Sequence, residues 1–239
     1  MRTAVVSDVH GNLTALEAVI ADLRSVAPDV VLQGGDLAYG GARPVEVLER
    51  VRDLCWAGVC GNTDEMLWAP ESLRNFAATT PTMKKLFEMT EEMRVWSCER
   101  LGEERIEWLK TIPMMWQQGE LAVVHAGPTD TWRAPGKDAT DDDLRKTFGE
   151  LNARVVVYGH IHVAFVRVMG EWTVANSGSV SLSYDGDARA SYAVVEGGKV
   201  EIRRVEYDVE REVESVRKAG MPHGEWVGAC LRAGRFVAP

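Results

Sequence analysis

The feature of this sequence that most constrains its fold is a regular succession of short apolar runs and helical segments. The apolar runs near the N-terminus cover residues 3–7, 29–33 and 55–60. The segments between them carry apolar side chains at helical spacing, and the second segment starts at Pro44, which suits the first position of a helix. Strands and helices that alternate in this way predict a parallel sheet with right-handed crossover connections.

Each of these three predicted strands ends in polar residues that can bind a metal ion or a phosphate. Asp8 and His10 follow the first strand, Asp36 follows the second, and Asn62 follows the third. Ligands of a parallel sheet bind outside the carboxyl ends of its strands. We therefore expect these four side chains to lie at one edge of the sheet.

The second half of the chain adds histidines in the same kind of position. His125 follows the apolar run 121–124, and His160 and His162 follow the run 155–158. A single Asp or His after a strand is usually a turn former or a hydrogen-bonded structural residue. Seven candidate ligands at successive strand ends, however, indicate a metal site. Carboxylate, imidazole and amide-oxygen donors suit divalent ions such as Mn²⁺, Fe²⁺, Ni²⁺ or Zn²⁺.

The remaining segments predict a helical insertion and a second group of strands. Residues 65–113 contain no strand-like run, and their apolar side chains recur at helical intervals up to Pro113. Residues 154–206 contain several short strands, and we expect this half to be mostly antiparallel. A charged helix near 208–219 and then an irregular tail complete the prediction. The acidic run 141–143 follows Thr140 and is interpreted as a helix start.

The composition limits the classes of partner. The formal net charge of −9 argues against extended contact with nucleic acid or anionic lipid. No apolar run is long enough to predict a membrane span. The N-terminus enters a strand directly, without the apolar core of a signal peptide, and the four cysteines form no CxxC pair. These features predict a cytoplasmic protein and leave its oligomeric state open.

Taken in order, the polar motifs resemble those of the calcineurin-like metallophosphoesterases. The motifs are Asp8-Val9-His10, Gly35-Asp36, Gly61-Asn62, His125 and Gly159-His160-Ile161-His162. The segments 125–128 and 176–180 also resemble bacterial and archaeal members. The resemblance implies a four-layer α/β sandwich, αββα, in which residues 1–239 form a single phosphoesterase domain. The insertion at about 65–113 would then be a helical cap over or beside the metal site.

The resemblance also implies a role for each of the seven residues. Asp8, His10, Asp36 and His162 match the ligands of one metal ion in the family. The ligands of the second metal ion in the family are matched by Asp36, Asn62, His125 and His160. Asp36 would therefore bridge two divalent ions. The implied activity is hydrolysis of a small phosphorylated substrate by a hydroxide that bridges the ions. His10 and Asn12 are further candidates for orienting the phosphate.

One departure from the family pattern affects the expected substrate. Many members carry His directly after the Gly-Asn motif, where it is placed to protonate the leaving group, and here that residue is Thr63. A threonine hydroxyl is far too weak an acid for this role, so we expect a phosphodiesterase. The alternatives are a phosphomonoesterase and a non-catalytic metal-binding interaction module on the same fold. We interpret Asp64 either as support for the turn or as an ordinary loop carboxylate, and Trp132 as a candidate for stacking on the substrate.

Overall fold

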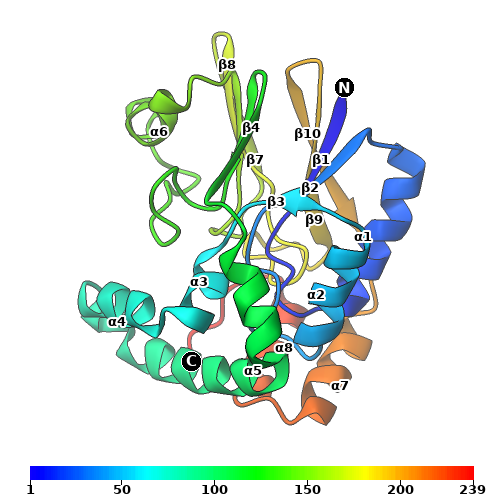
Figure 1. The fold of residues 1–239 in the computed structure, drawn as a ribbon, viewed down its shortest axis with the longest axis vertical. Coiled ribbons are helices and arrows are strands. Elements are labelled where there is room, and N and C mark those ends of the chain that lie inside the picture. Colours follow the sequence, from blue (N-terminus) through cyan, green and yellow to red (C-terminus); the bar gives the residue numbers. More distant parts are fainter.

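Two five-stranded sheets form the centre of the computed structural model, which describes residues 1–239 (Figure 1). The first sheet has the strand order β10-β9-β1-β2-β3. Its strands are β1 (Arg2–Val6), β2 (Val30–Gln33), β3 (Ala57–Gly58), β9 (Ala190–Glu196) and β10 (Lys199–Val205). The first three strands are parallel, as predicted, and β9 and β10 are antiparallel to their neighbours.

The second sheet has the strand order β4-β5-β6-β8-β7. Its strands are β4 (Met115–Gln118), β5 (Leu121–Val124), β6 (Val155–Tyr158), β7 (Phe165–Met169) and β8 (Trp172–Asn176). Most strand pairings of the second half of the chain are antiparallel, as predicted, but β5, β6 and β8 are parallel to one another. These strands are buried on both faces, and the connection from β6 to β8 is the edge strand β7 rather than a helix. The sequence pattern of a crossover helix is therefore absent between β6 and β8.

Alternation along the strands separates a core between the sheets from two outer cores. On β1, Val5 packs between the sheets, whereas Ala4 and Val6 pack outward. On β5, the side chains of Leu121 and Val123 point between the sheets, and their neighbours point outward. The outer face of the first sheet is covered by α1 (Leu13–Val26) and α2 (Pro44–Asp53). The outer face of the second is covered by α6 (Asp141–Phe148) and the 3₁₀ turn η2 (Gly149–Leu151) (Figure 1). The predicted four-layer α/β sandwich is confirmed.

Local sequence signals explain where the covering helices begin and end. Helix α2 begins at Pro44, and α1 ends one residue before Ala27, which adopts a left-handed conformation next to Pro28. In α6 the Thr140 hydroxyl accepts the Asp143 N–H, while the Asp143 carboxylate accepts the Thr140 N–H. The acidic run 141–143 is thus a helix start, as predicted.

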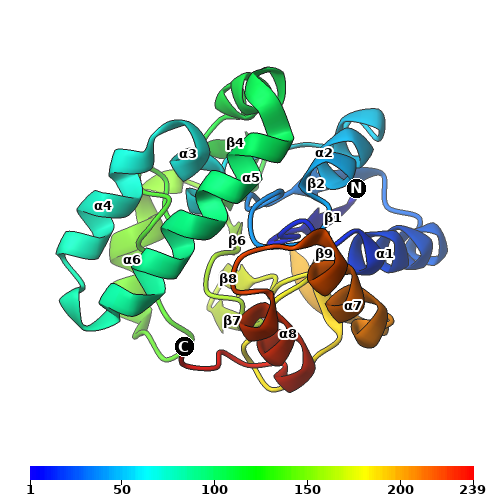
Figure 2. The same cartoon turned by 90° about the horizontal axis from the view of Figure 1, so that it is seen from below.

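The remaining helices gather at the carboxyl ends of the parallel strands. The predicted helical segment consists of α3 (Asn62–Trp68), α4 (Pro70–Ala78), the 3₁₀ turn η1 (Pro81–Met83) and α5 (Lys84–Lys110), which is kinked at Gly102. Seen from that end, α4 and α5 lie on one side and α7 (Val209–Ala219) and α8 (Gly224–Ala233) on the other (Figure 2). None of the helices has the length and apolar character needed to cross a membrane.

Helix α8 replaces the irregular tail expected after residue 219. Its two glycines, which read as helix breakers in the sequence, allow α8 to pack closely on α7. A Cβ added to Gly224 would lie 2.9 Å from a methyl group of Val216, and one on Gly228 would lie 3.0 Å from a methyl group of Val213. The helix depends on this tertiary contact, which no local pattern reveals.

Candidate metal centre

The strand ends of both sheets bring all seven predicted site residues together. Asp8 and His10 follow β1, Asp36 follows β2, and Asn62 opens α3 after β3. The second sheet contributes the rest, with His125 after β5 and His160 and His162 after β6. Six of the seven side chains are buried, and His160 is half-buried.

Four of these residues form a set whose donor atoms surround a common point. One donor atom from each of Asp8, His10, Asp36 and His162 lies within 4.8 Å of the others. The His162 Nε2 atom is 3.1 Å from Asp8 Oδ1 and 3.2 Å from His10 Nε2, and His10 Nε2 is 3.6 Å from Asp36 Oδ2. Ligands that each bind one ion at about 2.1 Å lie about 3.0–3.4 Å apart. The set therefore fits a single divalent cation.

A second set lies on the other side of Asp36. His125 Nε2 is 3.4 Å from Asp36 Oδ1 and 3.0 Å from Asn62 Oδ1, and His160 Nδ1 is 2.8 Å from the same Asn62 oxygen. The two carboxylate oxygens of Asp36 thus face different sets, Oδ2 toward His10 and Oδ1 toward His125. This is the arrangement expected of a carboxylate shared by two cations.

Backbone carbonyl groups orient three of the imidazoles. The Nδ1 atoms of His10, His125 and His162 lie 2.9, 2.8 and 2.6 Å from the carbonyl oxygens of Tyr39, Gly34 and Leu182. An Nδ1–H that donates to a carbonyl leaves the lone pair of Nε2 free for a metal ion. These carbonyl partners could not be predicted from the sequence, because every residue has a backbone carbonyl group whatever its side chain.

The backbone at the site is unusual. Five of the seven residues have positive φ angles, with values of 59° at Asp8, 47° at His10, 56° at Asp36, 68° at His160 and 56° at His162. A residue with a side chain costs about 1–2 kcal/mol in this left-handed region. Strained conformations of this kind concentrate at functional sites, because the surrounding structure must hold them in place.

Asp64 holds two of the ligand-bearing loops together, which favours its interpretation as a support of the turn over that as an ordinary loop carboxylate. Its carboxylate oxygens accept the backbone N–H groups of Asp36 at 2.8 Å, Leu37 at 2.9 Å and Gly61 at 3.1 Å. Burial and the charge of Asp36 raise the pKa of Asp64 to about 7, while these donors oppose the shift. The carboxyl group thereby links the loop after β2 to the loop after β3.

Comparison with known proteins identifies the family. A model of the calcineurin-like phosphoesterase superfamily domain matches residues 1–199. This chain belongs to the calcineurin-like phosphoesterase superfamily. The predicted resemblance is confirmed, and the matched range contains both sets of donors.

The phosphoesterase is similar along its length to proteins from bacteria and archaea. An uncharacterized protein of Methanocaldococcus jannaschii is 29% identical over 255 residues, which cover 97% of this chain and 98% of the relative. The crystal structure of a metallophosphoesterase from Sphaerobacter thermophilus is 27% identical, with a TM-score of 0.78 and coverage of 98% and 99%. A hypothetical protein from Pyrococcus horikoshii shares the fold, with 18% identity, a TM-score of 0.82 and coverage of 99% of both chains.

The charges of the carboxylate and imidazole groups in the phosphoesterase site favour the binding of a cation. Burial disfavours a charged carboxylate, but the charge and hydrogen bonding of His125 hold the pKa of Asp36 far below its usual range. Burial likewise opposes protonation of His125, yet the Asp36 carboxylate raises the pKa of His125 to about 10. Burial and the neighbouring His125 lower the pKa of His160 to about 4. Anionic carboxylates among imidazole and amide donors suit divalent cations, and a cation that binds here would replace the proton that His125 holds beside Asp36.

A cavity of about 290 Å³ opens onto the donors of the phosphoesterase. Trp132 lines it, so the sequence placed this side chain correctly. Asn12 does not line the cavity. Its side chain caps α1 by accepting the Ala15 N–H at 2.9 Å, and it donates to Ser181 Oγ at 3.1 Å. The expectation that Asn12 orients a phosphate is therefore wrong.

Sequence reasoning did not single out the other aromatic side chains of this cavity. They are Tyr39, which follows β2, Phe87 of α5, and three residues of the second half of the chain, Tyr184, Trp226 and Phe236. Aromatic residues at these positions read as ordinary core packing, and only the tertiary fold brings them to the metal site.

Proposed function

We propose that this protein is a metal-dependent phosphoesterase that holds two divalent cations, one in each set of donors. The observation that carries the proposal is the position of Asp36, whose two oxygens face the two sets at 3.6 and 3.4 Å. Two such cations lower the pKa of a water molecule between them and offset charge on the phosphoryl oxygens. The donor types suit Mn²⁺, Fe²⁺, Ni²⁺ or Zn²⁺.

The side chains of the site form two groups, and each group holds one cation. Asp8, His10 and His162 hold one cation together with Asp36. Asn62, His125 and His160 hold the other, and the neutral amide of Asn62 limits the negative charge around it. The acidic exterior of the chain, with its net charge of −9, favours a small substrate over a polyanionic one.

We also propose that residues 1–239 work as a single domain. The cavity at the donors is lined by residues of the sheet ends, of the helical segment and of α8. The helical segment at about 65–113 is then a cap that completes the substrate site.

Hydrolysis of bis(p-nitrophenyl) phosphate after removal of metal and reloading with Mn²⁺, Fe²⁺, Ni²⁺ or Zn²⁺ tests the activity. We expect turnover that depends on the added metal and falls about 100-fold or more in His125→Ala, because this change removes a donor of the second set. His223→Ala is the matched control, since His223 contacts Glu92 away from the site. Inactivity with every metal would favour the non-catalytic interaction module.

We propose further that the enzyme prefers phosphodiesters, because Thr63 offers no effective acid. The Thr63 hydroxyl is buried and has no hydrogen-bond partner, and its backbone N–H donates to Asp36 Oδ1 at 2.9 Å. Methyl phenyl phosphate and phenyl phosphate form a matched pair, because they share the phenolate leaving group, which leaves poorly without protonation. We expect kcat/KM to favour the diester by about tenfold or more. A monoester preference above tenfold would identify a phosphomonoesterase instead.

A further inference from the structure

We propose that the cavity beside the metal centre binds a flat apolar substituent, such as an aromatic ring, on a phosphoester that carries a single phosphoryl group. The inference rests on the proposed function and specifies its substrate. The lining, charge and size of the cavity support it independently of one another.

The lining of the cavity is mainly apolar and rich in aromatic rings. Twelve of its 20 lining residues are hydrophobic. The Tyr184 ring stacks on His162 with centroids 4.7 Å apart and planes inclined by 23°, so the aromatic wall starts directly at a donor. Phe236 continues this wall, with its centroid 5.7 Å from that of Tyr184 and 6.1 Å from that of Trp226. A flat ring attached to a bound phosphoryl group would find aromatic surface next to it.

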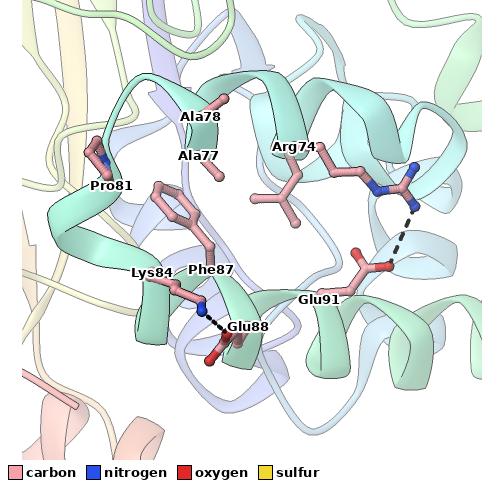
Figure 3. Close-up of a pocket in the computed structure, with 9 residues that line it drawn as sticks. Arg74, Ala77, Ala78, Pro81, Lys84, Phe87, Glu88 and Glu91 are labelled. Atoms are coloured by element: carbon pink, nitrogen blue, oxygen red, sulfur yellow. Dashed lines mark ion pairs between the residues drawn. The ribbon is translucent and has the colours of Figure 1, made fainter.

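The cavity provides no cation for a second phosphate or a carboxylate. None of its lining residues is Lys or Arg. Arg74 and Lys84 lie on the cap, in a separate cavity of about 420 Å³ between α4 and α5. Figure 3 shows both of them paired, Arg74 with Glu91 at 4.0 Å and Lys84 with Glu88 at 3.6 Å. An additional anionic group held against this lining would therefore have no Lys or Arg partner, which is costly.

Hydrophobic side chains separate the two cavities. Leu73 and Phe87 line both of them, and Phe87 is drawn with the lining of the outer cavity in Figure 3. The cap thus presents apolar surface toward the metal centre and keeps its charged side chains on the outer cavity.

Two polar atoms in the wall lack partners within the protein. They are the hydroxyl of Thr63, whose residue is 8% exposed, and the indole N–H of Trp132. Both residues line the cavity. A buried donor without a partner is satisfied when a ligand supplies an acceptor. The oxygen atoms of a phosphoester are such acceptors, and the rest of the wall would contact its apolar part.

The size of the cavity limits the substituent. An apolar cavity of about 150 Å³ is sufficient for benzene. The cavity of about 290 Å³ therefore accommodates a phosphoryl group and one small ring system within it.

Calorimetric titration of the Mn²⁺-loaded protein with three phosphonates tests the inference without relying on turnover. We expect phenylphosphonate to bind about tenfold or more tightly than methylphosphonate, because its ring is buried. We expect 4-carboxyphenylphosphonate, which adds a negatively charged carboxylate to the ring, to bind about tenfold or more weakly than phenylphosphonate.

Variants connect this preference to the cavity. Trp132→Ala and Phe87→Ala should each reduce the ratio of phenylphosphonate to methylphosphonate affinity to about threefold or less, whereas Trp132→Phe should keep most of it. Trp172→Ala is the matched control, because Trp172 packs on the outer face of the second sheet beside Arg145.

The outcomes separate the inference from the function on which it rests. Equal affinity for phenylphosphonate and methylphosphonate, or an unchanged ratio in both alanine variants, would overturn the aromatic pocket alone. Tighter binding of 4-carboxyphenylphosphonate than of phenylphosphonate would show that the cavity does accept a second anionic group. Failure of methylphosphonate to bind, together with the absence of metal-dependent hydrolysis, would overturn the proposed function as well.

Discussion

Asn in place of Asp36 is expected to lower kcat for bis(p-nitrophenyl) phosphate by about 1,000-fold or more at saturating Mn²⁺. Asp36 Oδ2 faces His10 and its Oδ1 faces His125, so one side chain serves both sets of donors. Asparagine has nearly the same shape but lacks the charge, and it replaces one of these oxygens with an NH₂ group that cannot bind a cation. Each 1.36 kcal/mol of lost stabilisation is a tenfold loss in rate, and a cation contributes several kcal/mol to phosphoryl transfer.

Metal content and kinetics together measure this effect. Elemental analysis after dialysis against Mn²⁺ should show fewer bound ions in Asp36→Asn than in the wild type, with unchanged circular dichroism. Asp22→Asn is the control, because Asp22 pairs with Arg203 at 3.1 Å outside the metal centre. If the activity of Asp36→Asn stayed within tenfold of the wild type, Asp36 would not be part of the catalytic site.

The second large effect is expected from Gly61→Ala, which should lower the free energy of unfolding by about 2–3 kcal/mol and weaken metal binding. A Cβ at Gly61 would lie 2.1 Å from Asp36 Oδ1 and 2.4 Å from the Asp36 backbone nitrogen. Backbone cannot move aside as a flexible side chain can, so the added methyl group must displace the loop after β2. The Gly61 N–H also donates to Asp64, and this hydrogen bond would be disturbed at the same time.

Urea unfolding and metal titration check the prediction for Gly61. Gly149→Ala is the matched control, because Gly149 has an ordinary helical conformation and no atom lies within 4 Å of an added Cβ. We expect its stability to stay within about 0.5 kcal/mol of the wild type. Wild-type stability and metal affinity in Gly61→Ala would show that the loops are not packed as described.

The candidate site could be predicted from the sequence because its geometry follows from local signals. Asp8, Asp36 and His125 each come directly after or close to the end of a strand that is recognisable as an apolar run. Parallel strands place their carboxyl ends at one edge, so knowledge of the strands was enough to bring the residues together. The helical segment after Asn62 was recognisable for a similar reason, since its apolar side chains keep helical spacing.

The features that escaped prediction depend on tertiary contacts, which join neighbouring segments in some cases and distant ones in others. Helix α8 forms against α7 through glycines that read as breakers, and β4 is a short edge strand with little apolar alternation. The aromatic cavity combines Phe87 with Tyr184 and Phe236, residues that are far apart in the chain. No local pattern distinguishes such aromatic residues from those of an ordinary core.

The left-handed backbone at five of the donor residues has a consequence for how the site meets its ligand. The strain is present in the folded chain, so its free-energy cost falls on the folding reaction. A cation that arrives finds donors already turned toward it and does not have to reorganise the loops. The site is in this sense preorganised, at the expense of thermodynamic stability. Glycine at the same five positions would relieve the backbone strain, but it would also remove the five side chains that donate to a cation.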